Sequence, residues 1–183
     1  VRSELARRSA AALKANVEDS FIVGTSNPEL SVTLQKPLDE LALEEFCSIP
    51  EGINANQKSS GSFYTLPQLS TLATKDALES WDQKHPPTIC DPSCGGGALL
   101  LASARWLLTR WPNESATRHL YGVDLNPIAV EITRWVLYLC DPLAKSKQLV
   151  QNIRYGNALL GIDFSDPPAS LPPHLASTLV GDS

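Results

Sequence analysis

The chain has 183 residues, of which 43% are apolar, and it carries a formal net charge of −5. This length suits one domain or slightly more, and the apolar fraction can fill a hydrophobic core. The acidic balance argues against strong non-specific binding of nucleic acid by these residues alone, because such binding comes largely from neutralising phosphates.

Targeting and cysteine patterns narrow the setting further. No apolar run approaches the roughly 18 residues that a membrane span needs, and the first residues lack the apolar core of a secretion signal, so we expect a cytoplasmic protein. The sequence has no CxxC pair and three histidines, which suggests neither a disulfide framework nor a zinc site. We expect buried free thiols at Cys47, Cys90, Cys94 and Cys140.

The first part of the chain predicts a helical leader. Residues 1–16 have amphipathic helix spacing, and Leu38 to Phe46 predicts a second helix that is acidic on one side. Residues 51–61 are rich in Asn, Gln, Ser and Gly, which is typical of a surface linker. We therefore expect a helical leader and linker over residues 1–58. Because the chain contains no methionine and begins with Val1, we favour a piece of a longer protein.

The next helix has start signals of its own. Thr65 and Gln68 have capping-box spacing, and Pro67 lies in the first turn, so we expect the helix to start at Thr65. The amino end of such a helix can bind a carboxylate, and Phe63 and Tyr64 can wall an adenosine. Two aromatic residues before a helix cap also occur as plain packing.

From residue 61 onward, strands and helices alternate. The expected elements are a helix from Thr65 to about Trp81, a strand from Thr88 to Cys90, a helix from Ala98 to Trp111, a strand from His119 to Val123, a helix capped by Asn126 with Pro127 at its first position, and a strand from Asn152 to Tyr155. This order predicts a doubly wound α/β domain with a parallel sheet, in which ligands bind at the carboxyl ends of the strands.

A glycine loop joins the first expected strand to its helix, with the sequence Asp91-Pro92-Ser93-Cys94-Gly95-Gly96-Gly97. Consecutive glycines let the backbone approach a ligand closely, and the N–H groups of the new helix attract an anion. An acidic residue before the glycines would repel a pyrophosphate but would pair with the ammonium group of an amino acid. S-adenosylmethionine carries both the ammonium and the carboxylate, so it is the ligand that the loop favours.

Two further polar residues follow the next strands. Asp124 ends the second strand, where an acidic residue accepts hydrogen bonds from both hydroxyls of a ribose. The alternative is that it only begins the turn before the capped helix. Asn157 follows the third strand and can hydrogen-bond an adenine edge, or it can be a turn residue after a glycine.

Taken together, these residues resemble the amino-terminal half of a gamma-type DNA adenine-N6 methyltransferase. They are similar to the modification subunits and fused restriction-modification enzymes of bacterial type I and type IIG systems. The resemblance covers about residues 60 to 163 and rests on four elements: Ser62-Phe63-Tyr64-Thr65, Asp91-Pro92-Ser93-Cys94-Gly95-Gly96-Gly97, Tyr121-Gly122-Val123-Asp124-Leu125-Asn126 and Gly156-Asn157-Ala158-Leu159-Leu160-Gly161. It implies a Rossmann-like class I methyltransferase fold with S-adenosylmethionine as cofactor.

The resemblance also implies a role for each matched position. Thr65 would lie near the methionine carboxylate, Asp124 would bind the ribose hydroxyls, Leu125 would touch the adenine face, and Asn157 would approach the adenine amino group. The full expected cofactor-binding set is Phe63, Tyr64, Thr65, Asp91, Pro92, Ser93, Cys94, Gly95, Gly97, Asp124, Leu125, Asn126, Asn157 and Ala158.

The sequence departs from the family at several of these positions. The family usually has Ala where Ser93 stands and Ser where Gly96 stands, and we expect both changes to be mild. Where Leu66 stands the family often has a second proline. Family members frequently have Asp where Asn157 stands, and an amide can still accept the same hydrogen bond.

A catalytic element is missing from the pattern. Family members carry an Asn-Pro-Pro-aromatic element after a fourth strand, which holds the target amino group and stacks on the flipped base. The comparable run here, Asp166-Pro167-Pro168-Ala169, lacks the aromatic residue and is expected to be a loop. We therefore expect residues 59–163 to be the cofactor-binding part, residues 164–183 a Pro- and Ser-rich loop, the domain to be incomplete at its C-terminal side, and no catalytic residue in this piece.

The implied function is the cofactor-binding portion of a DNA methyltransferase in a restriction-modification or phage-defence system. Double-stranded DNA would bind through other regions, with a specificity or nuclease subunit or domain as a further partner. One alternative is a protein glutamine methyltransferase, although the Phe-Tyr-Thr segment weighs against it. Another is a non-catalytic S-adenosylmethionine-binding regulatory module. A nicotinamide-dependent oxidoreductase is disfavoured by Asp91 and by the absence of a third glycine after Gly97.

Overall fold

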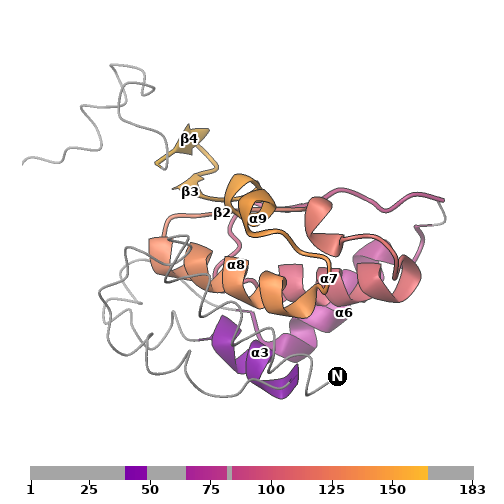
Figure 1. The fold of residues 1–183 in the computed structure, drawn as a ribbon. Helices are drawn as coiled ribbons and strands as arrows, with labels where there is room; N and C mark the ends of the chain where they lie inside the picture. The colour runs from indigo at the N-terminus through magenta and orange to yellow at the C-terminus, as the bar shows by residue number, and fades with distance from the viewer. Residues whose placement is uncertain (1–39, 49–64, 82–83, 165–183) are drawn as a thin grey trace, which may run out of the picture.

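The computed structural model of the chain describes residues 40–48, 65–81 and 84–164 (Figure 1). Its elements, in chain order, are α3 (Glu40–Cys47), α6 (Pro67–Leu78), β1 (Ile89–Asp91), α7 (Ala98–Arg110), the 3-10 helix η1 (Ala116–Arg118), β2 (Leu120–Asp124), α8 (Pro127–Cys140), α9 (Ser146–Asn152), β3 (Ile153–Asn157) and β4 (Ile162–Asp163). The predicted alternation of strands and helices is confirmed. The expected helix at residues 1–16, the linker at 51–61 and the Pro-rich run at 166–169 lie outside the described residues.

The four strands form one sheet in the order β1-β2-β3-β4. β1 pairs parallel with β2, and β2 pairs parallel with β3, while β4 runs antiparallel to β3. The predicted parallel sheet is confirmed for β1, β2 and β3, and the antiparallel β4 was not expected, which gives an open, mostly parallel sheet of a Rossmann-like fold. Figure 1 shows α6, α7 and α8 gathered on one side of the strands. Among the described residues, β1 has one paired edge, the one that faces β2.

Helix α8 lies at the centre of the hydrophobic core, which explains why it is apolar around most of its circumference. Its buried Val130 and Leu137 belong to a cluster formed with residues of the sheet and of α7. Its Ile132, Trp135 and Leu139 belong to a second cluster, formed with α3 and α7. The α3 residues of this second cluster, each at most 5% exposed, are Leu43, Phe46 and Cys47. The second helix of the expected leader therefore packs directly on the α/β core.

The starts of α6 and α8 show one prediction that failed and one that held. In α6 the N-cap is Leu66, which is extended at φ −60° and ψ 143° and makes no side-chain cap bond. The predicted start at Thr65 is wrong because Pro67 disfavours helical geometry in the residue before it. In α8 the predicted cap forms, since Asn126 Oδ1 accepts from the backbone N–H groups of residues 128 and 129 at 3.0 and 3.4 Å.

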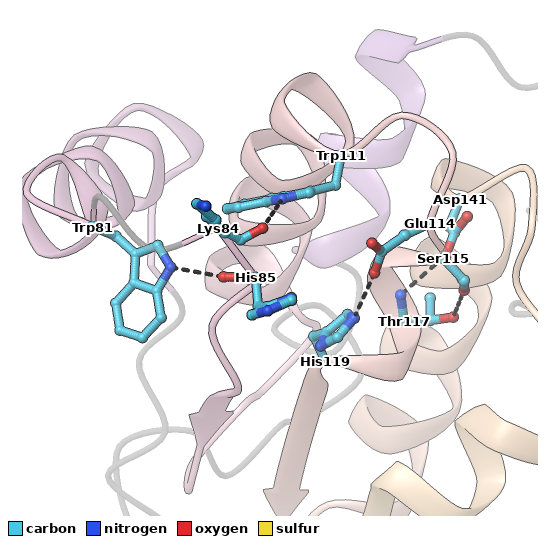
Figure 2. A network of polar contacts seen from close by, with 9 residues as sticks. All are labelled: Trp81, Lys84, His85, Trp111, Glu114, Ser115, Thr117, His119 and Asp141. Carbon is cyan, nitrogen blue, oxygen red and sulfur yellow. Dashed lines mark hydrogen bonds and ion pairs between the residues drawn. The ribbon is translucent and has the colours of Figure 1, made fainter.

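A buried carboxylate organises the amino-terminal side of the sheet (Figure 2). Asp141, which is fully buried, accepts hydrogen bonds from Ser115 Oγ at 2.7 Å and from the Thr117 N–H at 3.0 Å. Its other oxygen accepts from the Leu143 N–H at 2.8 Å. These bonds tie the end of α8 to η1, the segment that leads into β2. This acidic residue therefore supports the fold at the end of the sheet away from the glycine loop.

Two tryptophans hold the segment that leads into β1, also seen in Figure 2. Trp81 Nε1 donates to the carbonyl of His85 at 3.0 Å, and Trp111 Nε1 donates to the carbonyl of Lys84 at 3.2 Å. Each indole N–H thus satisfies a loop carbonyl while its ring packs nearby.

None of the helices among the described residues has the length and apolar character that a bilayer crossing needs.

The cysteine prediction holds in part. All four thiols are free, and Cys47 and Cys94 are buried while Cys140 is partly buried. Cys90 is exposed, contrary to expectation. It lies on β1, where alternate residues point to opposite faces of the strand, and its neighbour Ile89 takes the face that packs against the core.

Candidate functional site

Three segments with polar side chains meet the carboxyl-terminal edge of the sheet. The glycine loop follows β1, Asp124 ends β2, and Asn157 ends β3. Because these three strands run parallel, their carboxyl ends lie at the same edge. Two backbone donors of the loop also reach across to β2, from Cys94 N to the Val123 carbonyl at 2.9 Å and from Gly95 N to Asp124 Oδ2 at 2.8 Å. The structure thus brings the first two predicted segments into direct contact.

The glycine loop adopts a conformation that needs glycine at two positions. Gly95 and Gly97 have φ values of 51° and 86°, in the left-handed region that side chains disfavour. Thr133 of α8 stabilises the loop by donating a hydrogen bond from its Oγ1 to the Gly95 carbonyl at 2.8 Å. Helix α7 begins directly after Gly97, so its first N–H groups face the loop and favour an anionic group there.

The middle glycine is needed for a different reason. A Cβ at Gly96 would lie 2.0 Å from the carbonyl oxygen of Cys47 and 2.7 Å from its carbonyl carbon. The end of α3 therefore occupies the space where the resembled family usually has a serine side chain. We expected this departure to be mild, and the structure shows instead that the close approach of α3 excludes any side chain at this position.

Asp124 is fixed by the backbone on both of its oxygens. Oδ2 accepts from Gly95 N and Oδ1 accepts from Asn126 N, each at 2.8 Å. A carboxylate has about four lone-pair sites, so each oxygen keeps one for a ligand. The bond to Asn126 N is the turn role considered for this residue, and it holds the carboxylate in place. Two adjacent hydroxyls, such as those of a ribose, match the acceptors that are left.

Asp91 has the electrostatics of a site for a cation. Its Oδ1 accepts from Ser93 N at 3.1 Å, and the residue is partly buried. Burial raises the pKa of Asp91, and the nearby negative charge of Asp124 raises it further, against the opposite effect of the Ser93 hydrogen bond. An ammonium group beside Asp91 would favour the charged carboxylate and so act against both effects. The residues present therefore fit the amino acid end of S-adenosylmethionine.

Cys94 contributes packing to the loop. Burial raises the pKa of its thiol strongly, and the charges of Asp124 and Asp91 add to this, so the side chain stays protonated and is a poor nucleophile. A Cβ on Gly122 of β2 would lie 3.1 Å from Cys94 Sγ and 2.9 Å from Leu100 Cδ1. Glycine at position 122 thus makes room for the loop, a need that the sequence did not reveal. Pro92 and Ser93 are exposed.

The expected adenine end consists of residues after β2 and β3. Leu125 is 62% exposed and presents an apolar side chain next to Asp124. Asn126 uses its side chain to cap α8, and Ala158 is exposed. Asn157 is partly exposed, and its Oδ1 accepts from the backbone N–H groups of Leu159 and Leu160 at 3.0 and 3.1 Å. These bonds are the turn role that the sequence analysis gave as the alternative for this residue.

The Phe-Tyr-Thr element is described at one of its three residues. Thr65 is exposed and lies two residues before α6, which packs against α7. Phe63 and Tyr64 lie outside the described residues. Their expected contact with the cofactor stays a prediction.

A small cleft lies elsewhere, between α3, α6 and α7. It is lined by apolar and polar residues, among them Cys47, Leu101 and Thr71, and the ion pair of Glu44 and Arg105 also lines it. It contains none of the predicted site residues. The candidate site is therefore an open edge rather than this cleft. No group of His, Cys, Asp and Glu side chains suited to holding a metal ion occurs in the described ranges.

Comparison with known proteins adds one finding to this geometry. A family model described as N-6 DNA methylase matches residues 46–169, which is more than half of the chain. The matched range begins near the end of α3 and includes all four strands with the loops at their carboxyl ends. The chain matches no curated protein and no solved structure.

Proposed function

Since the chain belongs to the N-6 DNA methylase family, we propose that it forms the S-adenosylmethionine-binding part of a gamma-type DNA adenine-N6 methyltransferase. The observation that carries this proposal is the hydrogen bond from Gly95 N of the glycine loop to Asp124 Oδ2. It couples the loop after β1 to the acidic residue after β2, so that one small region offers acceptors for an ammonium group and for a pair of hydroxyls.

The chain's own residues would bind and orient the cofactor. Asp91 would pair with the ammonium group, and the N-terminus of α7 would attract the carboxylate. Asp124 would accept from the ribose hydroxyls, Leu125 would cover one face of the adenine, and Asn157 would meet its edge. When bound, S-adenosylmethionine supplies an electrophilic methyl group on its sulfonium. The contribution of these residues is then positioning and electrostatics, which is how such a site lowers the barrier for an in-line displacement.

The remaining parts of the activity belong to other sequence in this proposal. The run at residues 166–169 lacks an aromatic residue, so we assign the capture of the target adenine, and the grip on double-stranded DNA, to regions outside this piece. The piece alone is then inactive in methyl transfer. A restriction-modification or phage-defence role in the cytoplasm, with a specificity or nuclease subunit or domain as partner, completes the proposal. The family match favours DNA over protein glutamine as the substrate.

Calorimetric titration of S-adenosylmethionine into the 183-residue chain tests the proposal. We expect saturable binding that weakens at least about tenfold in Asp91→Asn and in Asp124→Asn, because each change removes a charged hydrogen-bond acceptor. The matched control is Asp76→Asn, an exposed aspartate on α6, which should leave the affinity unchanged. A folded chain that binds no S-adenosylmethionine, or that binds it equally well in both site variants, would rule the site out. Competition by a nicotinamide dinucleotide would indicate the oxidoreductase alternative.

A further inference from the structure

The side-chain oxygen of Asn157 is fully occupied by hydrogen bonds within the chain. Its Oδ1 receives two hydrogen bonds, from Leu159 N at 3.0 Å and from Leu160 N at 3.1 Å, and an amide oxygen has two lone pairs. These bonds close the short loop between β3 and β4, where Asn157 pairs with Ile162. Because both N–H groups need an acceptor, the orientation of the amide is fixed with its oxygen toward the loop.

The group left over is therefore the Nδ2 amino group. In the part of the chain that the structure describes, Nδ2 has no hydrogen-bond partner, and Asn157 is partly exposed at the carboxyl end of β3. An aspartate in the same turn would hold both backbone N–H groups with one oxygen and offer a second oxygen outward. Asparagine offers a hydrogen-bond donor at that place instead. An aspartate here would present an acceptor to the ligand, whereas Asn157 presents a donor.

We propose that Asn157 donates a hydrogen bond from Nδ2 to a ring nitrogen of the cofactor's adenine, rather than accepting one from the adenine amino group. This inference rests on the proposed function. The exocyclic amino group of adenine is a donor, whereas its ring nitrogens are acceptors, so a donating side chain can pair only with the ring. Asn157 then recognises a ring nitrogen of the adenine and leaves the recognition of the amino group to other atoms.

The direction in which one substitution changes the ligand affinity tests this assignment. Asn157→Asp keeps the turn, since a carboxylate oxygen accepts the same two N–H groups, but it replaces the outward donor with an acceptor. We expect calorimetry to show that S-adenosylhomocysteine binds Asn157→Asp at least about tenfold more weakly than it binds the native chain, because a lone pair now faces a lone pair. Equal or tighter binding by Asn157→Asp would overturn the proposal. A thermal unfolding midpoint no lower than that of the native chain would show that the turn is retained.

A second set of probes changes the ligand instead of the protein. Analogues of S-adenosylhomocysteine in which N1, N3 or N7 is replaced by C–H each remove one ring acceptor. We expect one of the three to bind the native chain about tenfold more weakly, and the same analogue to show no such loss in Asn157→Asp. The proposal fails if no analogue loses affinity for the native chain. If S-adenosylhomocysteine does not bind at all, the proposed function fails with it, whereas binding that depends on Asp91 but shows none of these patterns removes this inference alone.

Discussion

Asp91 is a residue whose placement opposes the stability of the free protein. Burial and the charge of Asp124 raise its pKa above the ordinary value for an aspartate. The folded state therefore holds its proton more tightly than the unfolded state does. In the pH window between the unfolded and the folded pKa, stability falls as the pH rises, and above the folded pKa the full cost is present. A destabilising buried charge of this kind is typical of a residue that binds a ligand of opposite charge.

The first prediction follows from this sign. Asp91→Asn removes the charge while keeping the acceptor for Ser93 N, so we expect its free energy of unfolding at neutral pH to exceed that of the native chain. The difference should shrink as the pH falls through the window in which Asp91 gains its proton. Thermal unfolding followed by circular dichroism from acidic to neutral pH measures it. A variant less stable than the native chain at neutral pH would show that Asp91 has a stabilising partner instead.

A second prediction concerns Gly96. Because its missing Cβ would collide with the backbone of Cys47, Gly96→Ser should force α3 away from the loop, at a cost of about 1–3 kcal/mol in the free energy of unfolding. Gly161→Ser is the matched control, since nothing lies within 4 Å there and the cost comes from a φ of +65° alone. We expect S-adenosylmethionine affinity to fall in the first variant and to stay unchanged in the second. Denaturant titration and calorimetry measure the two effects, and equal affinities would contradict the coupling of α3 to the loop.

For single residues, the sequence predicts those features that depend on residues next to them in the chain. The cap at Asn126 with Pro127 behind it is a local signal, and the structure confirms it. The need for glycine at position 96 depends on α3, which lies about fifty residues earlier in the chain, so no local pattern could reveal it. The two turn bonds that occupy Asn157 Oδ1 depend on the loop that β4 creates, and β4 itself was not foreseen.

Helix α3 connects the expected leader to the core. Most of it precedes the residues that the family model matches, yet Phe46 at its end is 5% exposed and packs with residues of α7 and α8. We predict that Phe46→Ala lowers the free energy of unfolding by about 3–5 kcal/mol, the usual cost of emptying a buried aromatic site. Glu45→Ala, on the exposed face of the same helix, should change it by less than about 0.5 kcal/mol. Urea titration of both variants checks this, and similar small effects would show that α3 is dispensable.

Arg134 joins α8 to the start of β3. Its guanidinium donates from Nε to the Ile153 carbonyl at 2.9 Å and from Nη1 to Glu131 Oε1 at 2.5 Å, and its side chain is 9% exposed. Arg134→Met would leave Glu131 without its cation, although burial already raises the pKa of that carboxyl. We predict a loss of about 3–5 kcal/mol in the free energy of unfolding. The exposed Arg118→Met serves as the control, and an equal response of the two variants to denaturant would contradict this role.

Element prediction succeeded where the pattern was long. α7 and α8 span 13 and 14 residues, enough for several turns of apolar periodicity, and their bounds match the expected ones closely. α9 has seven residues and β4 has two, which is too short for a period to emerge, and both were missed. The parallel direction of β1, β2 and β3 followed from the alternation of strands and helices, because a helical crossover joins strands that run the same way.

On the scale of the whole molecule, the described part of the sheet is covered unevenly. Cys90 and Tyr121 are register partners in β1 and β2, and both are exposed, whereas Leu120 on the other face is fully buried. The helices α6, α7 and α8 lie on the covered side (Figure 1). Within the described residues, this face of the sheet is therefore open and β1 is paired on one edge, so both can accept further packing.

This unevenness gives the last prediction. In the folded chain Cys90 should react quickly with a thiol reagent such as 5,5′-dithiobis(2-nitrobenzoate), because it is exposed on β1. Cys94 and Cys47 should react at least about tenfold more slowly, since burial protects them and raises the pKa of each thiol, that of Cys47 to about 12. Cys90→Ser should remove the fast phase and leave the slow ones. If the fast phase survives unchanged in Cys90→Ser, Cys90 is not the reactive thiol and this face of the sheet is covered.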